Sequence, residues 1–574
     1  MHTLGSIPYK TRSRQRCEPS CLRRGRSASL VPFRDSAMAT MADTVLCIAP
    51  SVPSRSLERH VLWNVTLGLL ALKLAWPTLD IAQQQYTPVW VGVKQCSAPT
   101  PAWLAAQALH DLSWLANLSR IPRRLTATTV RGHTGPVSPF RVHPTGWMPM
   151  EHQLPTHERS YLRQLAARQA EYAALPVMEQ RKAMWYALND APPGAGAGVQ
   201  PPVVIETWTF DRDFMPDGIL QCQSDLGRRI EYQLRAHLRN HELIDDDKVI
   251  PDTFDIGWVV HIDPYGVEIP RVTIPDAQGV PTGYRWQHPI RDIRHDLDLL
   301  QPAVCQVDRP ATLAYQAFLD DLLGDLLPVE IRSDTFGNGM LTHRVVELMG
   351  MEAFFLAMYD SPDQVHRLMA YLRDNALRVM RWAEAEGLLR LNNANQASFG
   401  SSYNYTHRLP ARDLAGGPVQ LRDMWGCANS QETVGVSPAM FHEFCAPYYA
   451  AVCEPLGLLY YGCCEPAHPF WEDIRMLPHL KKVSISRWCD ERYMGEALRG
   501  ADIVYSRKPD PNYLAIDVTL DEDAWASHVR ATLDAARDVA LEFIVRDVYT
   551  VHGNLGNARR AVEIARREIA RARG

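Results

Sequence analysis

Between Met424 and Gly574, short apolar runs alternate with segments of helical pattern. Four runs have the character of strands, and they begin at residues 457, 481, 502 and 541: GLLYYG, KKVSIS, DIVYSR and LEFIVRD. A helical segment follows each run: one after Pro469, ERYMGEAL, one near Asp521 to Ala540, and a terminal one from about Asn557. Alternation of this kind is typical of parallel strands joined by crossover helices. It predicts an α/β fold with a parallel sheet.

Local signals also predict where helices start and stop. Ser437-Pro438 and Ser361-Pro362 each place an N-cap serine before a proline at the first helical position. Residues 156–190 form an amphipathic helical lead-in that is interrupted at Pro176. The run APPGAGAGVQPP (residues 191–202) is a break, and VVIETW (residues 203–208) suits a first buried strand.

Each late strand is followed by side chains capable of chemistry. The groups are Cys463-Cys464-Glu465, Trp488-Cys489-Asp490, Arg507-Lys508 and Arg546-Asp547. In a parallel barrel the carboxyl ends of the strands converge on one face, which carries the active site. The pattern therefore indicates an enzyme and places its site at this face.

The first 150 residues differ from the remainder in composition. They hold 17 Lys+Arg and 6 Asp+Glu, a net charge of +11, whereas the remaining residues have a net charge of −16. Three interpretations stay open: an Arg- and Ser-rich targeting peptide, a disordered tail, or sequence upstream of a true start at Met148 or Met150. We favour the last two and expect two parts: a basic segment of low order, residues 1–150, and a catalytic domain, residues 151–574.

Overall composition excludes several classes of protein. The 46% apolar and 22% charged residues are ordinary for a globular protein, and the net charge of −5 argues against nucleic-acid binding. The most apolar stretch, Val61 to Trp76, is too short and too polar to span a membrane. The 12 cysteines show no disulfide spacing, which favours reduced thiols and a cytoplasmic location.

Two longer segments carry a family resemblance. ELMGMEAFFLAMYDSPDQVHRLM and GCANSQETVGVSPAMFHEFCAPYYAAVCEPLGLLYYGCCEPAHPFWEDIRMLPHLKKVSIS resemble the superfamily of uroporphyrinogen decarboxylases and corrinoid-dependent methyltransferases. The resemblance covers roughly Thr156 to Gly574 and is strongest after Met424. It implies a (β/α)8 TIM barrel, which here would have the helical lead-in and the basic N-terminal segment in front of it.

The resemblance implies two activities that differ in their site residues. True decarboxylases carry an RQAGRY-type segment near the first strand; here VVIETWTFDRDFMPD contains Arg212 but not that segment. A decarboxylase of a porphyrinogen or a smaller acid, with Arg507, Lys508 and Arg546 holding carboxylates and Asp547 stabilising a developing cation, is therefore the second hypothesis. A barrel that acts only as a binding scaffold is the third.

The resemblance to coenzyme M methyltransferases implies a zinc ion that activates a thiol. Those enzymes have His-x-Cys at the end of the fifth strand, whereas this sequence reads Tyr461-Gly462-Cys463 and has no cysteine after Cys489. A substitute ligand set would be Cys463, Glu465 and His552, with a fourth position open to solvent or substrate. The alternative for His552 is a surface histidine.

Our leading hypothesis is a methyltransferase or demethylase that moves a methyl group between a small substrate and a corrinoid carried by a partner protein. The sequence has no Asp-x-His-x-x-Gly cobalamin motif of its own. Substrate and oligomeric state are left open. Asp547, Glu465 and Asp490 are the candidate catalytic acids or bases, and the candidate substrate-binding residues are Trp425, Glu432, Arg507, Lys508 and Glu206.

Several of these candidates also have purely structural interpretations. Asp490 could cap the next helix, Trp425 could fill the core, and Arg507 and Lys508 could be solvated loop charges. Cys463 and Cys464 are adjacent, and adjacent residues on a strand point to opposite faces. At most one of the two thiols is therefore expected to face the site.

Overall fold

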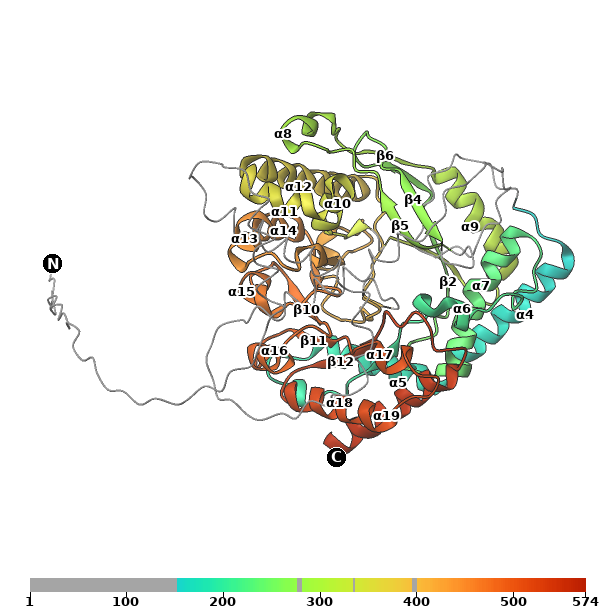
Figure 1. Cartoon of the computed structure of the whole chain (residues 1–574). Coiled ribbons are helices and arrows are strands. Elements are labelled where there is room, and N and C mark those ends of the chain that lie inside the picture. The colour runs from blue at the N-terminus through green and yellow to red at the C-terminus, as the bar shows by residue number, and fades with distance from the viewer. Residues whose placement is uncertain (1–151, 276–280, 334–335, 395–399, 574) are drawn as a thin grey trace, which may run out of the picture. The chain divides into compact units, whose positions relative to one another are not determined.

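The computed structural model describes residues 152–275, 281–333, 336–394 and 400–573 (Figure 1). The basic segment of residues 1–150, and the three interpretations of it, lie outside the described residues. None of the helices in the described ranges has the length and apolarity of a membrane span.

A six-stranded parallel sheet forms the centre of the described structure. Its strand order is β1-β12-β11-β10-β9-β8. The first strand of the chain thus pairs with the last, and the others follow in sequence order. The strands are β1 (Val203–Ile205), β8 (Trp425–Ala428), β9 (Leu458–Tyr461), β10 (Leu480–Ile485), β11 (Val504–Arg507) and β12 (Leu541–Val545).

Two further parallel strands, β2 (Phe254–Gly257) and β7 (Val329–Arg332), pair with each other. A single parallel bridge between Asn338 and Cys427 links the segment after β7 to β8. Within the described ranges no ladder joins β1 to β2 or β7 to β8, so the hydrogen-bonded ladders do not by themselves close the sheet. The architecture is a mixed α/β fold with a six-stranded parallel sheet; the closed barrel expected from the resemblance is not confirmed.

Helices alternate with strands along the described chain. They are α4 (Thr156–Ala173), α5 (Pro176–Asp190), α6 (Asp211–Phe214), α7 (Asp225–Arg239), α8 (Ile293–Asp296), α9 (Arg309–Leu323), α10 (Leu341–Met349), α11 (Met351–Asp360), α12 (Pro362–Ala385), α13 (Pro438–Phe444), α14 (Ala446–Cys453), α15 (Trp471–Ile474), α16 (Glu491–Leu498), α17 (Asn512–Ala515), α18 (Glu522–Ala535) and α19 (Leu555–Arg573). In Figure 1, α18 and α19 lie side by side, and α19 contacts β1.

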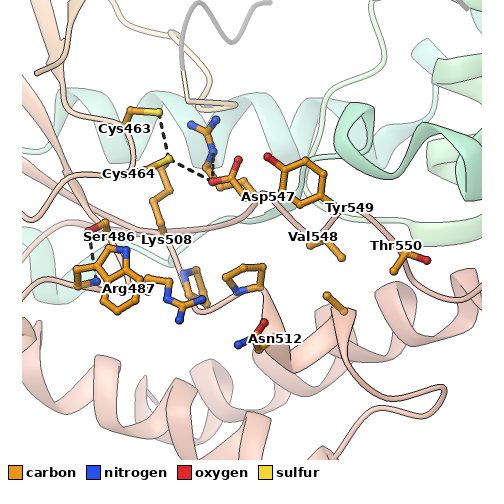
Figure 2. Close-up of a pocket in the computed structure, with 15 residues that line it drawn as sticks. Cys463, Cys464, Ser486, Arg487, Lys508, Asn512, Asp547, Val548, Tyr549 and Thr550 are labelled. Carbon is orange, nitrogen blue, oxygen red and sulfur yellow. Dashed lines mark hydrogen bonds and ion pairs between the residues drawn. The ribbon is translucent and has the colours of Figure 1, made fainter. Parts of the chain in front are cut away.

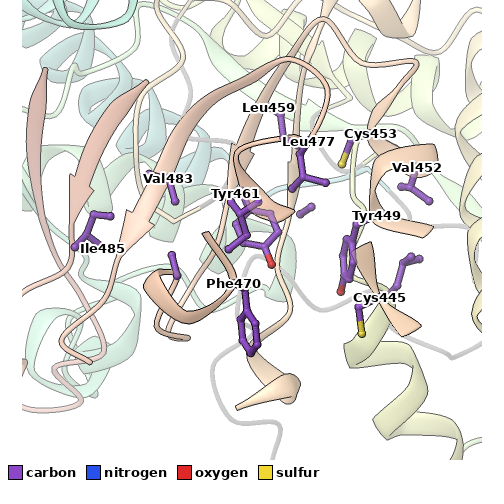
Figure 3. Packing of buried hydrophobic residues seen from close by; sticks show 14 of the residues in the cluster. Cys445, Tyr449, Val452, Cys453, Leu459, Tyr461, Phe470, Leu477, Val483 and Ile485 are labelled. Carbon is purple, nitrogen blue, oxygen red and sulfur yellow. The ribbon is translucent and has the colours of Figure 1, made fainter. Parts of the chain in front are cut away.

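The two faces of the sheet differ in chemistry. Alternate residues such as Val483, Ile485 and Tyr461 belong to the largest apolar cluster of the described residues. This cluster also contains Tyr449 and Val452 of α14 (Figure 3). Full burial of such a side chain contributes about 1.5–3 kcal/mol. The opposite face carries buried polar side chains, including Lys482 and Glu542, whose charged atoms lie 3.2 Å apart. This polar face leads to the carboxyl ends of the strands.

An antiparallel insertion separates β2 from β7. It contains β3 (Val260–Asp263) paired with β6 (Val304–Val307), and β4 (Arg271–Pro275) paired with β5 (Pro281–Trp286). The Arg271 guanidinium lies over the rings of Tyr284 and Trp286. The sequence reasoning did not predict this insertion.

The predicted elements of the last third agree with the structure. β9, β11 and β12 lie inside their predicted runs, β10 begins one residue before its run, and α16 coincides with ERYMGEAL. Ser437 caps α13 by accepting the Met440 amide, as expected. Ser361 is the N-cap residue of α12, as predicted, but its side chain makes no capping hydrogen bond there.

Candidate functional site

A cavity of about 460 Å³ opens at the carboxyl ends of β9 to β12. This size suits a small molecule. The residues that line it belong to the segments after these four strands and to α17 (Figure 2). The expected position of the site, at the carboxyl ends of the parallel strands, is therefore where the described structure has its cavity. The lining residues are Cys463, Cys464, Ser486, Arg487, Trp488, Lys508, Pro509, Pro511, Asn512, Ala515, Arg546, Asp547, Val548, Tyr549 and Thr550.

Both cysteines after β9 face this cavity. The Sγ atoms of Cys463 and Cys464 lie 3.4 Å apart (Figure 2). The expectation that only one thiol would face the site is wrong, because the strand ends at Tyr461 and Gly462 takes a φ of +96°. This left-handed turn breaks the alternation of a strand and is favourable mainly for glycine.

The two thiols differ in acidity. The hydrogen bond with Cys464, together with the positive charge of Arg546, lowers the pKa of Cys463 despite its burial. The same interaction and burial raise the pKa of Cys464. The Cys464 thiol also lies 3.3 Å from Oδ2 of Asp547. The Cys464 proton therefore lies between a sulfur and a carboxylate, and Cys463 is the better nucleophile of the pair.

Asp547 follows β12 directly and takes a left-handed conformation with φ of 59°. Tyr549 and His552, in the same loop, have φ values of 60° and 54°. Non-glycine residues in this region carry a strain on the order of 1–3 kcal/mol each and are concentrated at functional sites. The turn directs the Asp547 carboxylate toward Cys464, and its Oδ2 also lies 3.3 Å from Nε of Arg546.

Arg546 is a buried cation with unused hydrogen-bonding capacity. Arg546 is 8% exposed, and its Nη2 lies 3.7 Å from Oε2 of Glu206. Among the described residues, Nη1 has no hydrogen-bond partner, and Nε has only the ion-pair contact with Asp547. A buried donor without a partner is costly, so this guanidinium is suited to an anionic ligand in the cavity.

Lys508 is the second buried cation at the cavity. Its Nζ donates to the Gly400 carbonyl at 3.1 Å and to Ser506 Oγ at 2.9 Å. Burial lowers the pKa of Lys508 to about 7, although nearby acidic groups oppose the shift. Lys508 was predicted to bind substrate, and the structure places it in the cavity wall.

The proposed zinc ligands are not brought together. Both carboxylate oxygens of Glu465 accept backbone amides, from Ser430 at 2.8 Å and from Cys463 at 2.9 Å. His552 is exposed, and its Nε2 lies 3.0 Å from the Ala515 carbonyl. Within the described ranges, no three His, Cys, Asp or Glu side chains are placed to hold a metal ion. The ligand set of Cys463, Glu465 and His552 therefore does not fit zinc, and Glu465 instead holds the loop that carries Cys463.

Two other predicted residues have structural contacts. Asp490 is exposed and caps α16 by accepting the Tyr493 amide at 3.0 Å. Arg507 points away from the cavity, donates to the Ser486 carbonyl at 2.7 Å, and pairs with Glu491 at 2.6 Å. Arg507 and Lys508 are adjacent on β11 and its extension, so only the second reaches the site.

The remaining predicted residues lie around the site or away from it. Glu206 is 3% exposed and accepts from Ser401 Oγ at 2.7 Å, which places it behind Arg546. Trp425 is fully buried, with its indole N–H donating to the Asn404 carbonyl, as a core residue would. Glu432 is buried and accepts from Thr342 at 2.8 Å. None of the three is among the residues that line the described cavity.

Cys464, Arg546 and Tyr549 line the cavity but were not among the predicted site residues. Gly462 before the cysteine pair was a usable signal, because a glycine at a strand end often marks a turn. Arg546 appeared only in the decarboxylase hypothesis. The cavity position of Tyr549 depends on the left-handed loop after β12, for which the sequence offers no signal.

No protein-family model matches the sequence, and no curated protein matches it. Among solved structures, a methyltransferase from Methanosarcina mazei is similar with a TM-score of 0.39 and 14% sequence identity. The match covers 68% of this chain and 99% of that chain. At this TM-score the likeness carries no information about substrate, cofactor or partner.

Proposed function

We propose that this chain is an enzyme that transfers a methyl group between a small anionic substrate in the cavity and a corrinoid carried by a partner protein. The observation that supports it best is the Arg546 guanidinium, which is 8% exposed and, among the residues that the structure describes, has a donor without a partner beside Asp547 and the thiols. A buried site with oriented charges can bind and position a small charged substrate.

The residues suit different ends of such a substrate. Arg546 and Lys508 would hold a carboxylate, while Asp547 would stabilise positive charge on a methylated nitrogen or sulfur. A reduced corrinoid would supply the nucleophile for the methyl group. Since the zinc ligands do not fit, no step is assigned to a metal.

We also propose that the eight parallel strands form a (β/α)8 barrel, in the order β1, β2, β7 to β12. The bridge between Asn338 and Cys427 links the segment after β7 to β8, and the Asp247 amide donates to the Val203 carbonyl of β1 at 2.9 Å. The buried polar face with Lys482 and Glu542 would then be the barrel interior. The cavity would lie at the mouth of the barrel.

Methyl transfer can be tested with free cobalamin in place of the partner. The full chain is incubated with cob(I)alamin and a panel of small carboxylates that bear N-, O- or S-methyl groups, and methylcobalamin is followed by absorbance. We expect turnover with at least one carboxylate. Arg546→Met should lower kcat/KM about 10- to 100-fold, because a charge-assisted hydrogen bond is lost.

Arg499→Met is the matched control, since Arg499 is 59% exposed at its side chain and pairs with Asp538 away from the cavity. It should leave kcat/KM unchanged. The decarboxylase hypothesis remains the second candidate because the same buried cations would hold a carboxylate that is lost. Release of carbon dioxide from the panel without methyl transfer would contradict our proposal and favour the decarboxylase.

A further inference from the structure

The adjacent thiols of Cys463 and Cys464 form a feature that methyl transfer does not use. Their Sγ atoms lie 3.4 Å apart and both line the cavity. Figure 2 shows the two side chains pointing to the same region, with Cys464 between Cys463 and Asp547. Two thiols with this spacing can bind one atom together.

The spacing limits which atom this can be. A tetrahedral zinc ion, with Zn–S bonds of about 2.3 Å, would hold its sulfurs roughly 3.8 Å apart and would need further ligands. Two-coordinate linear ions place their sulfurs farther apart still. A trivalent arsenic atom is pyramidal, has bond angles nearer to a right angle, and needs only two thiolates besides its own substituent. The closer sulfurs here suit arsenic best.

We propose that Cys463 and Cys464 form a two-thiol site that binds a monosubstituted trivalent arsenical through two As–S bonds. This inference does not depend on the proposed methyl transfer. The cavity of about 460 Å³ leaves room for the arsenic substituent, and Trp488, Pro509, Pro511 and Val548 supply apolar surface beside it.

The chemistry balances with water as the only product released. An arsonous acid, R–As(OH)2, reacts with two thiols to give R–As(S–Cys)2 and two molecules of water. The Cys463 sulfur forms the first As–S bond as one hydroxide leaves, and the Cys464 sulfur forms the second as the other leaves. Each hydroxide takes up one thiol proton; Asp547, 3.3 Å from Cys464, can receive and pass on the second. No oxidant or reductant is required.

Cys305, Cys445 and Cys453 do not line the cavity. Cys445 and Cys453 are buried in the apolar core (Figure 3), and Cys305 lies on β6 of the insertion. Cys305 is partly exposed, which makes it a useful control for reaction with a single thiol.

The test uses phenylarsine oxide and the reduced full-length chain, without corrinoid or methyl donor. Intact-mass spectrometry should show one arsenical per chain, and thiol titration should show two thiols lost. Cys463→Ser and Cys464→Ser should each weaken binding about 100-fold or more, because the second bond to a tethered ligand is lost. Cys305→Ser should bind as the wild type, and a small dithiol, but not a monothiol, should release the arsenical.

Peptide mapping of the wild-type adduct keeps the test decisive if a variant fails to fold. The arsenical should be found on the peptide that contains Cys463 and Cys464. Wild-type affinity in both serine variants, or an adduct mapped elsewhere, would overturn the proposal. Because no methyl transfer is measured, failure here would leave the proposed function untouched, and the reverse also holds.

Discussion

At the scale of single residues, Lys508 gives the site a pH dependence. Its pKa is lowered to about 7 by burial, with Glu542, Arg546, Cys463 and Glu206 as the charged groups around it. We expect affinity for a small carboxylate such as acetate to fall about tenfold between pH 6 and pH 9, because the ammonium loses its proton. Ligand-observed NMR can measure this.

A rise in pH should weaken acetate binding but increase the contribution of Lys508 to stability, so measurements of binding and of unfolding should change in opposite directions. An unfolded lysine has a pKa of about 10.4, so between pH 7 and 10 the unfolded chain binds more protons and the contribution of Lys508 to stability rises with pH. Lys508→Arg should bind acetate with little pH dependence. Cys463→Ser should keep the pH dependence of acetate affinity. If the pH dependence is lost in that variant, the titrating group is the Cys463 thiol and not Lys508.

At the scale of an element, the end of β9 determines where the thiols point. Gly462 has φ of +96°, and a Cβ placed there would lie 3.0 Å from the Ser484 Cβ on β10. We expect Gly462→Ala to lower the free energy of unfolding by about 1–2 kcal/mol or more, because alanine is strained in this conformation. Denaturant titration is the measurement.

Gly218→Ala is the matched control, because Gly218 has φ of +82° and a Cβ placed there would meet nothing within 4 Å. It should carry the cost of the conformation alone. A larger loss in Gly462→Ala would then report the contact with Ser484. Equal losses would mean that β10 shifts at little cost to make room for the methyl group. No loss at Gly462 would contradict the left-handed turn at this residue.

At the scale of the whole molecule, removal of residues 1–150 tests whether the apolar clusters of the described residues are sufficient for stability. The apolar clusters and the residues packed on them run from Leu154 to Ile569. We expect a chain that starts at Glu151 to unfold within about 3 °C of the full chain in a thermal scan. A much lower midpoint would show that residues 1–150 contribute to stability.

A chain that starts at Pro192 is the contrasting case. It lacks α4 and α5, which supply the buried residues Leu162 and Trp185 to two of the clusters. Removal of both helices should prevent cooperative unfolding, because the apolar surface they cover would be exposed. Normal unfolding of this shorter chain would mean that the two helices are dispensable.

The sequence alone determined the elements of the last third. β9 to β12 and α16 were predictable because hydrophobic period, helix caps and prolines are local signals. The position of the cavity followed from one topological rule, that the carboxyl ends of parallel strands meet at one edge. Lys508 and Asp547 were predicted as site residues on that basis, and both line the cavity.

Only the tertiary structure decided which side chains meet. Arg507 pairs with Glu491, and Glu465 accepts the Ser430 amide, because residues of neighbouring segments supply partners for these side chains outside the cavity. The pairing of Cys463 with Cys464 depends on the left-handed turn at Gly462. Hydrophobic periodicity predicts one helix or strand at a time. A site forms where several elements end together, and the relative placement of these elements depends on packing across the whole fold.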